Sequence, residues 1–454
     1  MVVNRVDRGR YLDSVALMRV SRRLEALQGV EAAALMIGSP SNKALLRNAD
    51  LLAPEGEQAT PNDLVIAVRG AGAKAAMAQV DALLAEKAAS PAEGLPRARG
   101  LGGALELLPQ ANLALISVPG EFAAFEARKA LSRGLHVLLF SDNVSLEEEV
   151  ELKRLAAEKE RLLMGPDCGT ALIAGTPIAF ANVVPRGDIG IISASGTGLQ
   201  EVSTLIARMG GGISHGIGVG GRDLDARVGA LGTLAALDAL ERDPATRKIV
   251  LISKPPAPEV ARRVLERVKK SAKPSVVCFL GLDQAGVAPT LRDAAEQAMG
   301  RRLDSPGFSH RAVKGRVHGL YCGGTLCAEA ELIFQRRGLK GHVFIDLGDD
   351  EYTRGRPHPM IEPEIRNDHI VKAMNDSAVG VVLVDLVLGY GAHENPAAVL
   401  TRVLKQGKTV VASVTGTEQD PQVWSRQVAL LRAAGVLVAP SNAHAAELAA
   451  SLVS

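Results

Sequence analysis

Short apolar strands alternate with amphipathic helices along most of this chain, and this alternation restricts the fold more than any other feature of the sequence. Two stretches begin in the same way, with a strand, a turn of small residues and a helix. The first spans roughly residues 187–310 and has the turn Ser193–Gly198, and the second spans 315–454 and has the turn Cys322–Thr325. Buried strands separated by helices form parallel sheets, with functional loops at the carboxyl ends of the strands. The pattern therefore predicts two flavodoxin-like α/β domains that are weak internal repeats.

Three regions precede these repeats. Residues 1–90 follow the order αβαβα, which predicts a small ferredoxin-like α+β unit. Residues 91–110 are rich in Pro, Gly and Ala and predict a linker. Residues 111–186 return to short strands and amphipathic helices and predict a further parallel α/β domain. A chain of 454 residues with this organisation is expected to be an α/β protein of several domains.

The amino-acid composition argues against some classes of binding partner. The chain has 52 Lys+Arg against 50 Asp+Glu, a balance that argues against nucleic acid or an anionic membrane as a partner. Aromatic residues make up 3% of the chain, too few for a platform that stacks bases. No apolar run is long enough to span a bilayer, and no signal peptide is expected. The four cysteines form no CxxC pair, so we expect no cysteine metal centre, no disulfide framework and a cytoplasmic location.

The two small-residue turns are candidates for binding a phosphate. A turn without bulky side chains lets backbone N–H groups approach an anion, and the following helix adds its positive N-terminal end. Two such helices facing each other would enclose one phosphate. Neither turn is a Walker A loop, because GxxxxGK[ST] is absent. The alternative is that both are tight turns whose hydroxyl groups only cap the helices.

Several segments resemble a known superfamily. Residues 111–310 are similar to the α subunit of succinyl-CoA synthetase, through ISVPGEFAAFEARKALSRG, LMGPDCGTALIAG, GIISASGTGLQE and GIGVGGRD. Residues 315–454 are similar to the carboxy-terminal domain of that enzyme's β subunit, through GLYCGGTLCAEAEL, HVFIDLGDDE and VGVVLVDLVLGYG. The fusion of both parts behind a small N-terminal unit, with DLGDDEYTRGRPHPMIEPEIR in the last domain, resembles the FdrA family over nearly the whole chain.

The resemblance implies a fold and a set of site residues. It implies a truncated Rossmann-like domain of the CoA-binding type at 111–186 and a domain like the ligase α chain at 187–310. At 315–454 it implies a ligase domain like the carboxy-terminal part of the β chain. In the ligases, the helices after the two turns hold the phosphate of a phosphohistidine. The matching phosphate-binding positions here are Ser193, Ser195, Gly196, Thr197, Gly323, Gly324 and Thr325. Glu201 matches a carboxylate that steadies the phosphohistidine and is a catalytic candidate, although it could also cap or pair locally.

Two parts of the ligase machinery are missing. The ligase histidine lies in a loop that is replaced here by DQAGVAPTLRDAAEQAM, which holds no histidine. The Gly-rich loop that grips the CoA phosphates is also absent, so CoA is not expected to be a firm cofactor. Gly120, Asp142, Asp167 and Cys168 still lie at strand ends on the substrate or CoA side. Cys168 could be a nucleophile near a helix start, but we favour a small buried residue.

A charged loop in the last domain supplies further candidates. It holds Asp349, Arg354, Arg356 and His358. Arginine binds phosphate or carboxylate in a bidentate way, and carboxylates could hold Mg²⁺ or orient an amide N–H. We therefore expect Arg354, Arg356 and His358 to act in catalysis, with Asp349 and His393 near the substrate. The alternative is a solvated loop with internal ion pairs.

Three functional hypotheses follow. The FdrA resemblance implies a carbamoyltransferase subunit in purine and allantoin nitrogen catabolism, which exchanges a carbamoyl group between phosphate and an amide such as oxamate. Its ligand would be phosphate or carbamoyl phosphate, bound without a covalent relay. The superfamily implies instead an acyl-CoA synthetase or CoA-binding protein. The third hypothesis is a non-catalytic subunit. No ATP-grasp pattern is present, so we expect partner subunits or a homo-oligomer.

Overall fold

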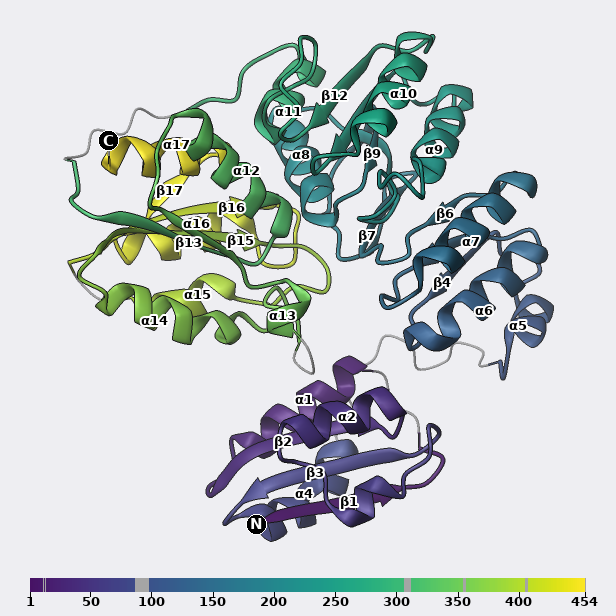
Figure 1. The fold of residues 1–454 in the computed structure, drawn as a ribbon, viewed down its shortest axis with the longest axis vertical. Helices are drawn as coiled ribbons and strands as arrows, with labels where there is room; N and C mark the ends of the chain where they lie inside the picture. The colour runs from purple at the N-terminus through teal and green to yellow at the C-terminus, as the bar shows by residue number, and fades with distance from the viewer. Residues whose placement is uncertain are drawn as a thin grey trace. The chain divides into compact units, whose positions relative to one another are not determined.

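The computed structural model describes residues 1–10, 12, 14–85, 98–305, 312–353, 357–404 and 407–453. The chain divides into two compact units (Figure 1). The first comprises residues 1–97 together with 350–357, and the second comprises residues 98–349 together with 358–454. The α/β fold class predicted from the sequence is confirmed, because parallel sheets with crossover helices make up the second unit.

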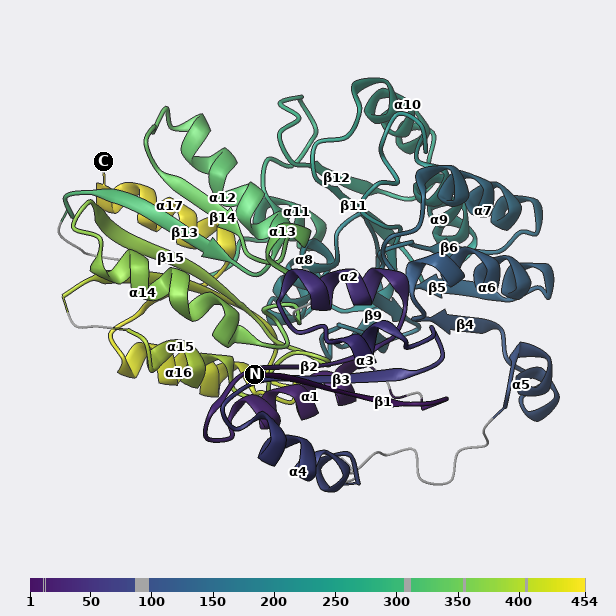
Figure 2. The same cartoon turned by 60° about the horizontal axis from the view of Figure 1, so that its bottom comes forward.

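The N-terminal unit has a three-stranded antiparallel sheet in the order β1-β3-β2. Its strands are β1 (Val2–Asp7), β2 (Val30–Ile37) and β3 (Leu64–Gly70), and its helices are α1 (Ser14–Glu25), α2 (Pro40–Asn48), α3 (Pro54–Glu57) and α4 (Ala73–Ala85). Helices cover both faces of the sheet (Figure 2), because Ile66 packs with α1 and α4 while Val65 packs with Leu46 of α2. The predicted order αβαβα missed β1, whose sequence VVNRVD is short and half polar.

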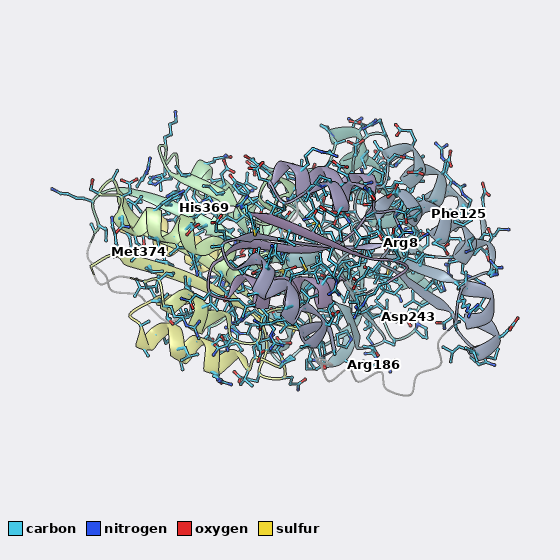
Figure 3. The ribbon with its side chains drawn as sticks, turned by 90° about the horizontal axis from the view of Figure 1, so that it is seen from below. Arg8, Phe125, Arg186, Asp243, His369 and Met374 are labelled. Atoms are coloured by element: carbon cyan, nitrogen blue, oxygen red, sulfur yellow. The ribbon has the colours of Figure 1, made fainter. Side chains whose placement is uncertain are left out.

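Residues 98–166 form a small parallel sheet in the order β4-β5-β6. Its elements are α5 (Leu101–Leu107), β4 (Leu113–Ile116), α6 (Gly120–Ser132), β5 (His136–Leu139), α7 (Leu146–Glu158) and β6 (Leu163–Met164). Strand β4 lies at the edge of the sheet, and large apolar side chains around it are exposed. This apolar edge consists of Leu107, Leu108, Leu115, Phe122 and Phe125. Phe125 is 64% exposed and lies on the outer side of its domain (Figure 3).

The next domain contains a six-stranded sheet in the order β12-β11-β9-β10-β7-β8. Its strands are β7 (Thr170–Ile173), β8 (Thr176–Ala179), β9 (Arg186–Ser193), β10 (Ile213–Gly218), β11 (Lys248–Ser253) and β12 (Ser275–Phe279). Its helices are α8 (Gly196–Arg208), α9 (Leu231–Arg242), α10 (Pro258–Lys269) and α11 (Leu291–Met299). Strands β9 to β12 are parallel, whereas β7 and β8 form an antiparallel hairpin at one edge.

The last domain contains a five-stranded parallel sheet in the order β14-β13-β15-β16-β17. Its strands are β13 (Arg316–Tyr321), β14 (Val343–Asp346), β15 (Val379–Val387), β16 (Thr409–Thr415) and β17 (Leu437–Ala439). Its helices are α12 (Gly324–Arg336), η1 (Pro363–Arg366), α14 (Asn367–Asn375), α15 (Pro396–Thr401), α16 (Trp424–Ala433) and α17 (Asn442–Val453). This strand order is the doubly wound 2-1-3-4-5 arrangement that the flavodoxin-like prediction requires.

Three predicted boundaries differ from the structure. Residues 91–110 were expected to be a linker, but Leu101–Leu107 form helix α5. Residues 111–186 were expected to form one domain, but β7 hydrogen bonds to β10, so the β7–β8 hairpin belongs to the six-stranded sheet. The charged loop was assigned to the last domain, but residues 350–357, including α13 (Asp350–Thr353), group with the N-terminal unit. A sequence pattern identifies a strand or helix and does not say which sheet it joins.

A buried ion network joins α7 to the six-stranded domain. The Lys153 ammonium lies 2.6 Å from Asp223 Oδ1 and 2.9 Å from Glu149 Oε1, and all three side chains are at most 1% exposed. Asp223 also accepts the backbone N–H groups of Gly232 and Thr233, each at 2.8 Å, and so caps α9. The motif GIGVGGRD therefore ends in a structural aspartate.

One hydrophobic core extends across the two flavodoxin-like domains. It includes Leu199 and Val202 of α8, Leu326 and Ala330 of α12, and residues of α11 and α17. This packing places the N-terminal ends of α8 and α12 together. No helix within the described ranges is long and apolar enough to cross a membrane.

Candidate site where two helix N-termini meet

The two small-residue turns are in direct contact. Helix α8 begins at Gly196 after β9, and α12 begins at Gly324 after β13. The Thr325 hydroxyl donates a hydrogen bond of 2.6 Å to Ser195 Oγ. A Cβ atom on Gly323 would lie 3.1 Å from the methyl carbon of Thr197. The sequence-predicted phosphate residues of both turns therefore share one location, at the carboxyl ends of β9 and β13.

The first turn is ordered by its own serines. Ser193 Oγ accepts the Ser195 N–H at 3.1 Å and donates to the Ser195 carbonyl at 2.7 Å. Ser195 Oγ accepts the Gly198 N–H at 2.9 Å and caps α8. In the part of the chain that the structure describes, the N–H groups of Gly196 and Thr197 have no protein acceptor. These two donors lie at the positive end of α8, where an anion is stabilised.

An aspartate, Asp385, accepts hydrogen bonds from two of the backbone N–H groups of the second turn. Asp385 at the end of β15 accepts the N–H groups of Cys322 at 2.7 Å and Gly323 at 2.8 Å. The buried Arg366 guanidinium lies 2.9 Å from Asp385 Oδ1 and balances its charge. Three N–H groups remain without an acceptor among the described residues, those of Gly324, Thr325 and Leu326. Both turns together therefore offer five backbone donors.

A small pocket opens beside the first turn. It is lined by Asp167, Cys168, Gly169, Thr170, Ser193, Ala194, Ser195, Gly196, Gly218, Gly220 and Gly221. Asp167 is exposed at its mouth, whereas Cys168 is buried and burial raises the pKa of its thiol to about 12. The Cys168 thiol is therefore protonated at neutral pH and is not a poised nucleophile.

Two charged residues that sequence reasoning did not assign lie over the second turn. A Cβ atom on Gly324 would overlap with Asp346 Oδ2 and would lie 3.1 Å from Lys254 Nζ. Asp346 ends β14 and Lys254 follows β11, so the two side chains come from different domains. Burial raises the pKa of Asp346 to about 6. Asp346 lies in the segment HVFIDLGDDE, but only the tertiary fold brings it and Lys254 to Gly324.

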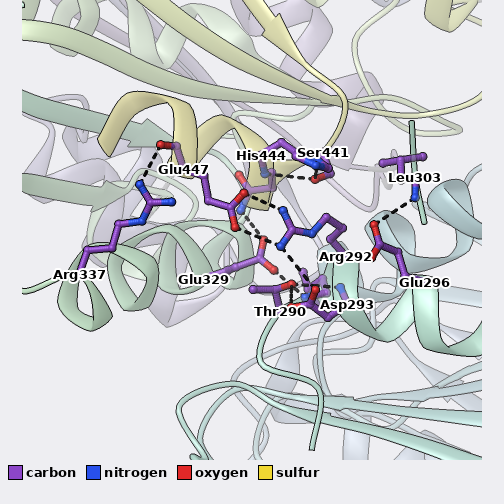
Figure 4. A network of polar contacts seen from close by, with 12 residues as sticks. Thr290, Arg292, Asp293, Glu296, Leu303, Glu329, Arg337, Ser441, His444 and Glu447 are labelled. Carbon is purple, nitrogen blue, oxygen red and sulfur yellow. Dashed lines mark hydrogen bonds and ion pairs between the residues drawn. The ribbon is translucent and has the colours of Figure 1, made fainter. Parts of the chain in front are cut away.

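Glu201 and Glu329 are buried behind the turns. Glu201 of α8 accepts the Thr415 hydroxyl and, at 2.9 Å, the Asn442 N–H at the start of α17. Glu329 of α12 accepts the Leu291 N–H at the start of α11, at 2.6 Å, and the Asn442 side-chain amide at 2.7 Å. Figure 4 shows Glu329 among the contacts that join α11, α12 and α17. Glu201 is thus held by two contacts with the last domain rather than by a local cap or pair.

The repeat could have revealed Glu329. When the first turn and its helix are aligned with the second, each residue pairs with the residue 128 positions later. The pairs include Gly196 with Gly324, Thr197 with Thr325, and Glu201 with Glu329. Aligning the two turns without a gap therefore pairs the glutamates.

The charged loop lies only partly within the described residues. Arg354 and Arg356 lie outside the described residues, and residues 350–357 group with the N-terminal unit. Asp349 is exposed at the end of the preceding turn. His358 lies in the second unit, where its Nδ1 accepts the Met360 N–H at 3.2 Å and burial lowers its pKa to about 4. His358 is therefore neutral, and its Nε2 faces Gly348.

The remaining candidates have local structural contacts. Gly120 is the first residue of α6, and a Cβ atom there would overlap with the Asp142 carbonyl oxygen. The backbone at Gly120 is therefore in close contact with the backbone at Asp142, at the strand ends on the predicted CoA side. The His393 N–H donates to the Met360 carbonyl at 2.8 Å, and its Nδ1 accepts the Asn395 N–H at 3.0 Å.

Comparison with known proteins agrees with this architecture. Residues 320–452 match the CoA-ligase family model, and residues 1–98 match the model described as AllF, heavy metal-associated domain. YahF of Escherichia coli (strain K12) is 41% identical over an alignment of 501 positions, which covers 98% of this chain and 97% of YahF. The succinate–CoA ligase [ADP-forming] subunit alpha-2 of Trichomonas vaginalis is 28% identical, over 53% of this chain and 75% of that subunit. A solved structure of ATP citrate lyase from Methanothrix soehngenii has a TM-score of 0.37 at 20% identity, and the match covers 58% of this chain and 40% of the lyase chain.

The fold and the paired turns define a succinyl-CoA synthetase-like protein with a CoA-ligase domain. Within that class, the match to YahF over nearly the full length of both chains shows that the chain belongs to the FdrA family.

The residues of the N-terminal unit do not fit a heavy metal. Residues 1–98 contain no cysteine and no histidine. Thiolate and imidazole are the ligands that zinc and copper sites use. In the described ranges, no group of three or more His, Cys, Asp or Glu could hold a metal ion.

Proposed function

We propose that this chain is the acyl-transfer component of a succinyl-CoA synthetase-like enzyme, and that it binds an acyl phosphate or phosphate non-covalently where α8 and α12 meet. One observation carries the proposal: the Thr325–Ser195 hydroxyl contact joins two turns that offer unpaired N–H groups. Preorganised donors of this kind stabilise the charge that develops on a leaving phosphate. Residues 281–309 contain no histidine, so the phosphate is not expected to pass through a phosphohistidine in that loop.

Two acceptors are compatible with this site. In the first, the CoA thiol attacks the acyl phosphate, as in an acid–thiol ligase; the CoA-ligase family match and the ligase relatives favour this acceptor. In the second, an amide nitrogen such as that of oxamate attacks carbamoyl phosphate, as in a carbamoyltransferase. The missing histidine favours the second acceptor. Both reactions break the same carbonyl–phosphate bond, so both use the same phosphate donors.

Partner subunits or a homo-oligomer remain part of the proposal. The ADP-forming ligase relatives are subunits by name, and an acyl phosphate would have to be supplied by another chain or from solution. The exposed apolar edge around β4 supports association, since contiguous exposed apolar groups mark interaction surfaces.

The test measures phosphate release by the full chain from acetyl phosphate and from carbamoyl phosphate, with CoA or oxamate as acceptor. Release that depends on CoA and yields a thioester assigns ligase chemistry, and release that depends on oxamate assigns carbamoyl transfer. Thr325→Val should lower kcat/KM by about tenfold or more, because one hydroxyl of the junction is lost. Thr176→Val, an equal change on the exposed edge strand β8, should leave turnover unchanged. No release with either acceptor, or an unaffected Thr325→Val variant, would refute the proposal.

A further inference from the structure

We propose that Lys254 and Asp346 are the charged residues of this site, with Lys254 binding the phosphate and Asp346 accepting the proton of the attacking nucleophile. The inference rests on the proposed function and adds two residues to it. It is carried by the meeting of two side chains from different domains above Gly324.

Parallel strands of two sheets place Lys254 and Asp346 at their carboxyl ends. Lys254 follows β11, the strand beside β9, and Asp346 ends β14, the strand beside β13. Doubly wound sheets bind their ligands at the carboxyl ends of such neighbouring strands. Because a side chain on Gly324 would occupy the space of Asp346 Oδ2, the glycine keeps this space open to both charged groups.

Lys254 makes no direct hydrogen bond or ion pair with a described residue, although its charge acts on the neighbouring Asp346. Its side chain is exposed. Its ammonium lies close to the first residue of α12, whose N-terminal end is itself positive. Two positive groups at one place repel each other unless an anion lies between them. The unpaired N–H groups of the two turns and the Lys254 ammonium therefore suit a single dianionic phosphate.

Asp346 has one oxygen available. Its Oδ1 accepts the Gly348 N–H at 3.0 Å, whereas Oδ2 has no partner among the described residues and lies against Gly324. Burial raises the pKa of Asp346, the neighbouring Asp385 and Asp349 raise it further, and Lys254 and the Gly348 N–H oppose them. His358 on the far side of Gly348 is neutral and adds no charge. A carboxylate with a pKa of about 6 is ionised at neutral pH and accepts a proton more readily than an ordinary aspartate.

The chemical step balances without a further reactant. The thiol or amide of the acceptor attacks the carbonyl carbon of the acyl phosphate, and its proton passes to Asp346 Oδ2. The new bond from carbon to sulfur or nitrogen forms, and the bond from carbon to the phosphate oxygen breaks. The leaving phosphate keeps the electron pair of that bond, and the proton on Asp346 passes to the phosphate or to water. Lys254 and the backbone donors hold the phosphate throughout.

The test uses sulfate, a phosphate-shaped anion whose charge is constant between pH 5 and 8. Calorimetry of the full chain should give tighter sulfate binding at pH 5 than at pH 8, because Asp346 becomes ionised between these values and repels the anion. Asp346→Asn should remove this pH dependence, and Lys254→Met should weaken binding about tenfold at both pH values. Asp188→Asn and Lys270→Met, exposed residues away from the turns, should behave as the unmodified chain does. Where turnover is measured, Asp346→Asn should lower kcat about a hundredfold.

The outcomes separate this inference from the proposed function. If the unmodified chain binds sulfate and both Lys254→Met and Asp346→Asn behave like it, the turns bind the anion and the roles of Lys254 and Asp346 are wrong. If pH dependence persists in Asp346→Asn, another group is responsible and the role of Asp346 is wrong. If the unmodified chain binds sulfate at neither pH, the anion site itself fails, and with it both the proposed function and this inference.

Discussion

Glu201 and Glu329 each cap a helix of the domain to which the other glutamate belongs. They occupy equivalent positions in α8 and α12, and each accepts the N–H at the start of the last helix of the opposite domain, Glu201 at Asn442 of α17 and Glu329 at Leu291 of α11. Asn442 touches both carboxyl groups. This reciprocal capping fixes the two helices on which the Thr325–Ser195 contact depends.

The buried Glu329 carboxyl predicts a pH dependence of stability. Burial is the main cause that raises its pKa from 4.5 to about 8. Between these values the folded chain keeps a proton that the unfolded chain has released, so the free energy of unfolding falls as pH rises through this window. The decrease is at most about 1.4 kcal/mol per pH unit. Thermal unfolding between pH 5 and 8 should show a smaller loss for Glu329→Gln than for the unmodified chain.

Glu331→Gln is the matched control for this measurement. Glu331 lies two residues further along α12 and is exposed. Its substitution should leave the pH slope as it is in the unmodified chain. An equal slope in Glu329→Gln and the unmodified chain would show that Glu329 titrates normally.

The Lys153 network predicts a large stability loss. Lys153→Met leaves the buried carboxylates of Asp223 and Glu149 without their shared cation. Breaking one partner of a buried ion pair costs about 3–5 kcal/mol. Chemical denaturation should show this loss for Lys153→Met and none for Lys159→Met, since Lys159 is exposed at the end of the same helix. A loss below about 1 kcal/mol in Lys153→Met would contradict the network's role.

Gly324→Ala should abolish anion binding without unfolding the chain. The added methyl group would overlap with Asp346 Oδ2 and approach Lys254. Alanine is well tolerated in the first turn of a helix, so circular dichroism should be unchanged. Gly102→Ala in α5 is the control, because a Cβ atom there meets nothing within 4 Å. Sulfate affinity that survives in Gly324→Ala would mean that the anion binds elsewhere.

The cysteines should not react in the folded chain. All four are buried, and burial raises the pKa of each thiol. A thiol reagent at pH 8 should therefore modify none of them before denaturation and all four afterwards. Rapid modification of Cys168 in the native chain would reopen its assignment as a nucleophile.

The local pattern of the sequence predicts the two flavodoxin-like sheets and the two turns, because buried parallel strands and small-residue turns are recognisable from neighbouring residues. The same reasoning missed β1, whose polar residues hide its alternation, and assigned β7 and β8 to the wrong sheet. Lys254 and Asp346 were missed for a different reason. They lie 92 positions apart and meet only through the packing of two domains. Glu201 was assigned to catalysis by resemblance, whereas its neighbours Thr415 and Asn442 come from the other domain.

Non-covalent binding of an acyl phosphate at the helix junction is the central claim, and calorimetric titration of the full chain with carbamoyl phosphate tests it most directly. Phosphate, CoA and ATP are titrated separately. The account predicts saturable binding of carbamoyl phosphate or phosphate, weakened about tenfold or more in Thr325→Val. No binding of either anion by the unmodified chain, or an affinity that Thr325→Val leaves unchanged, would contradict it.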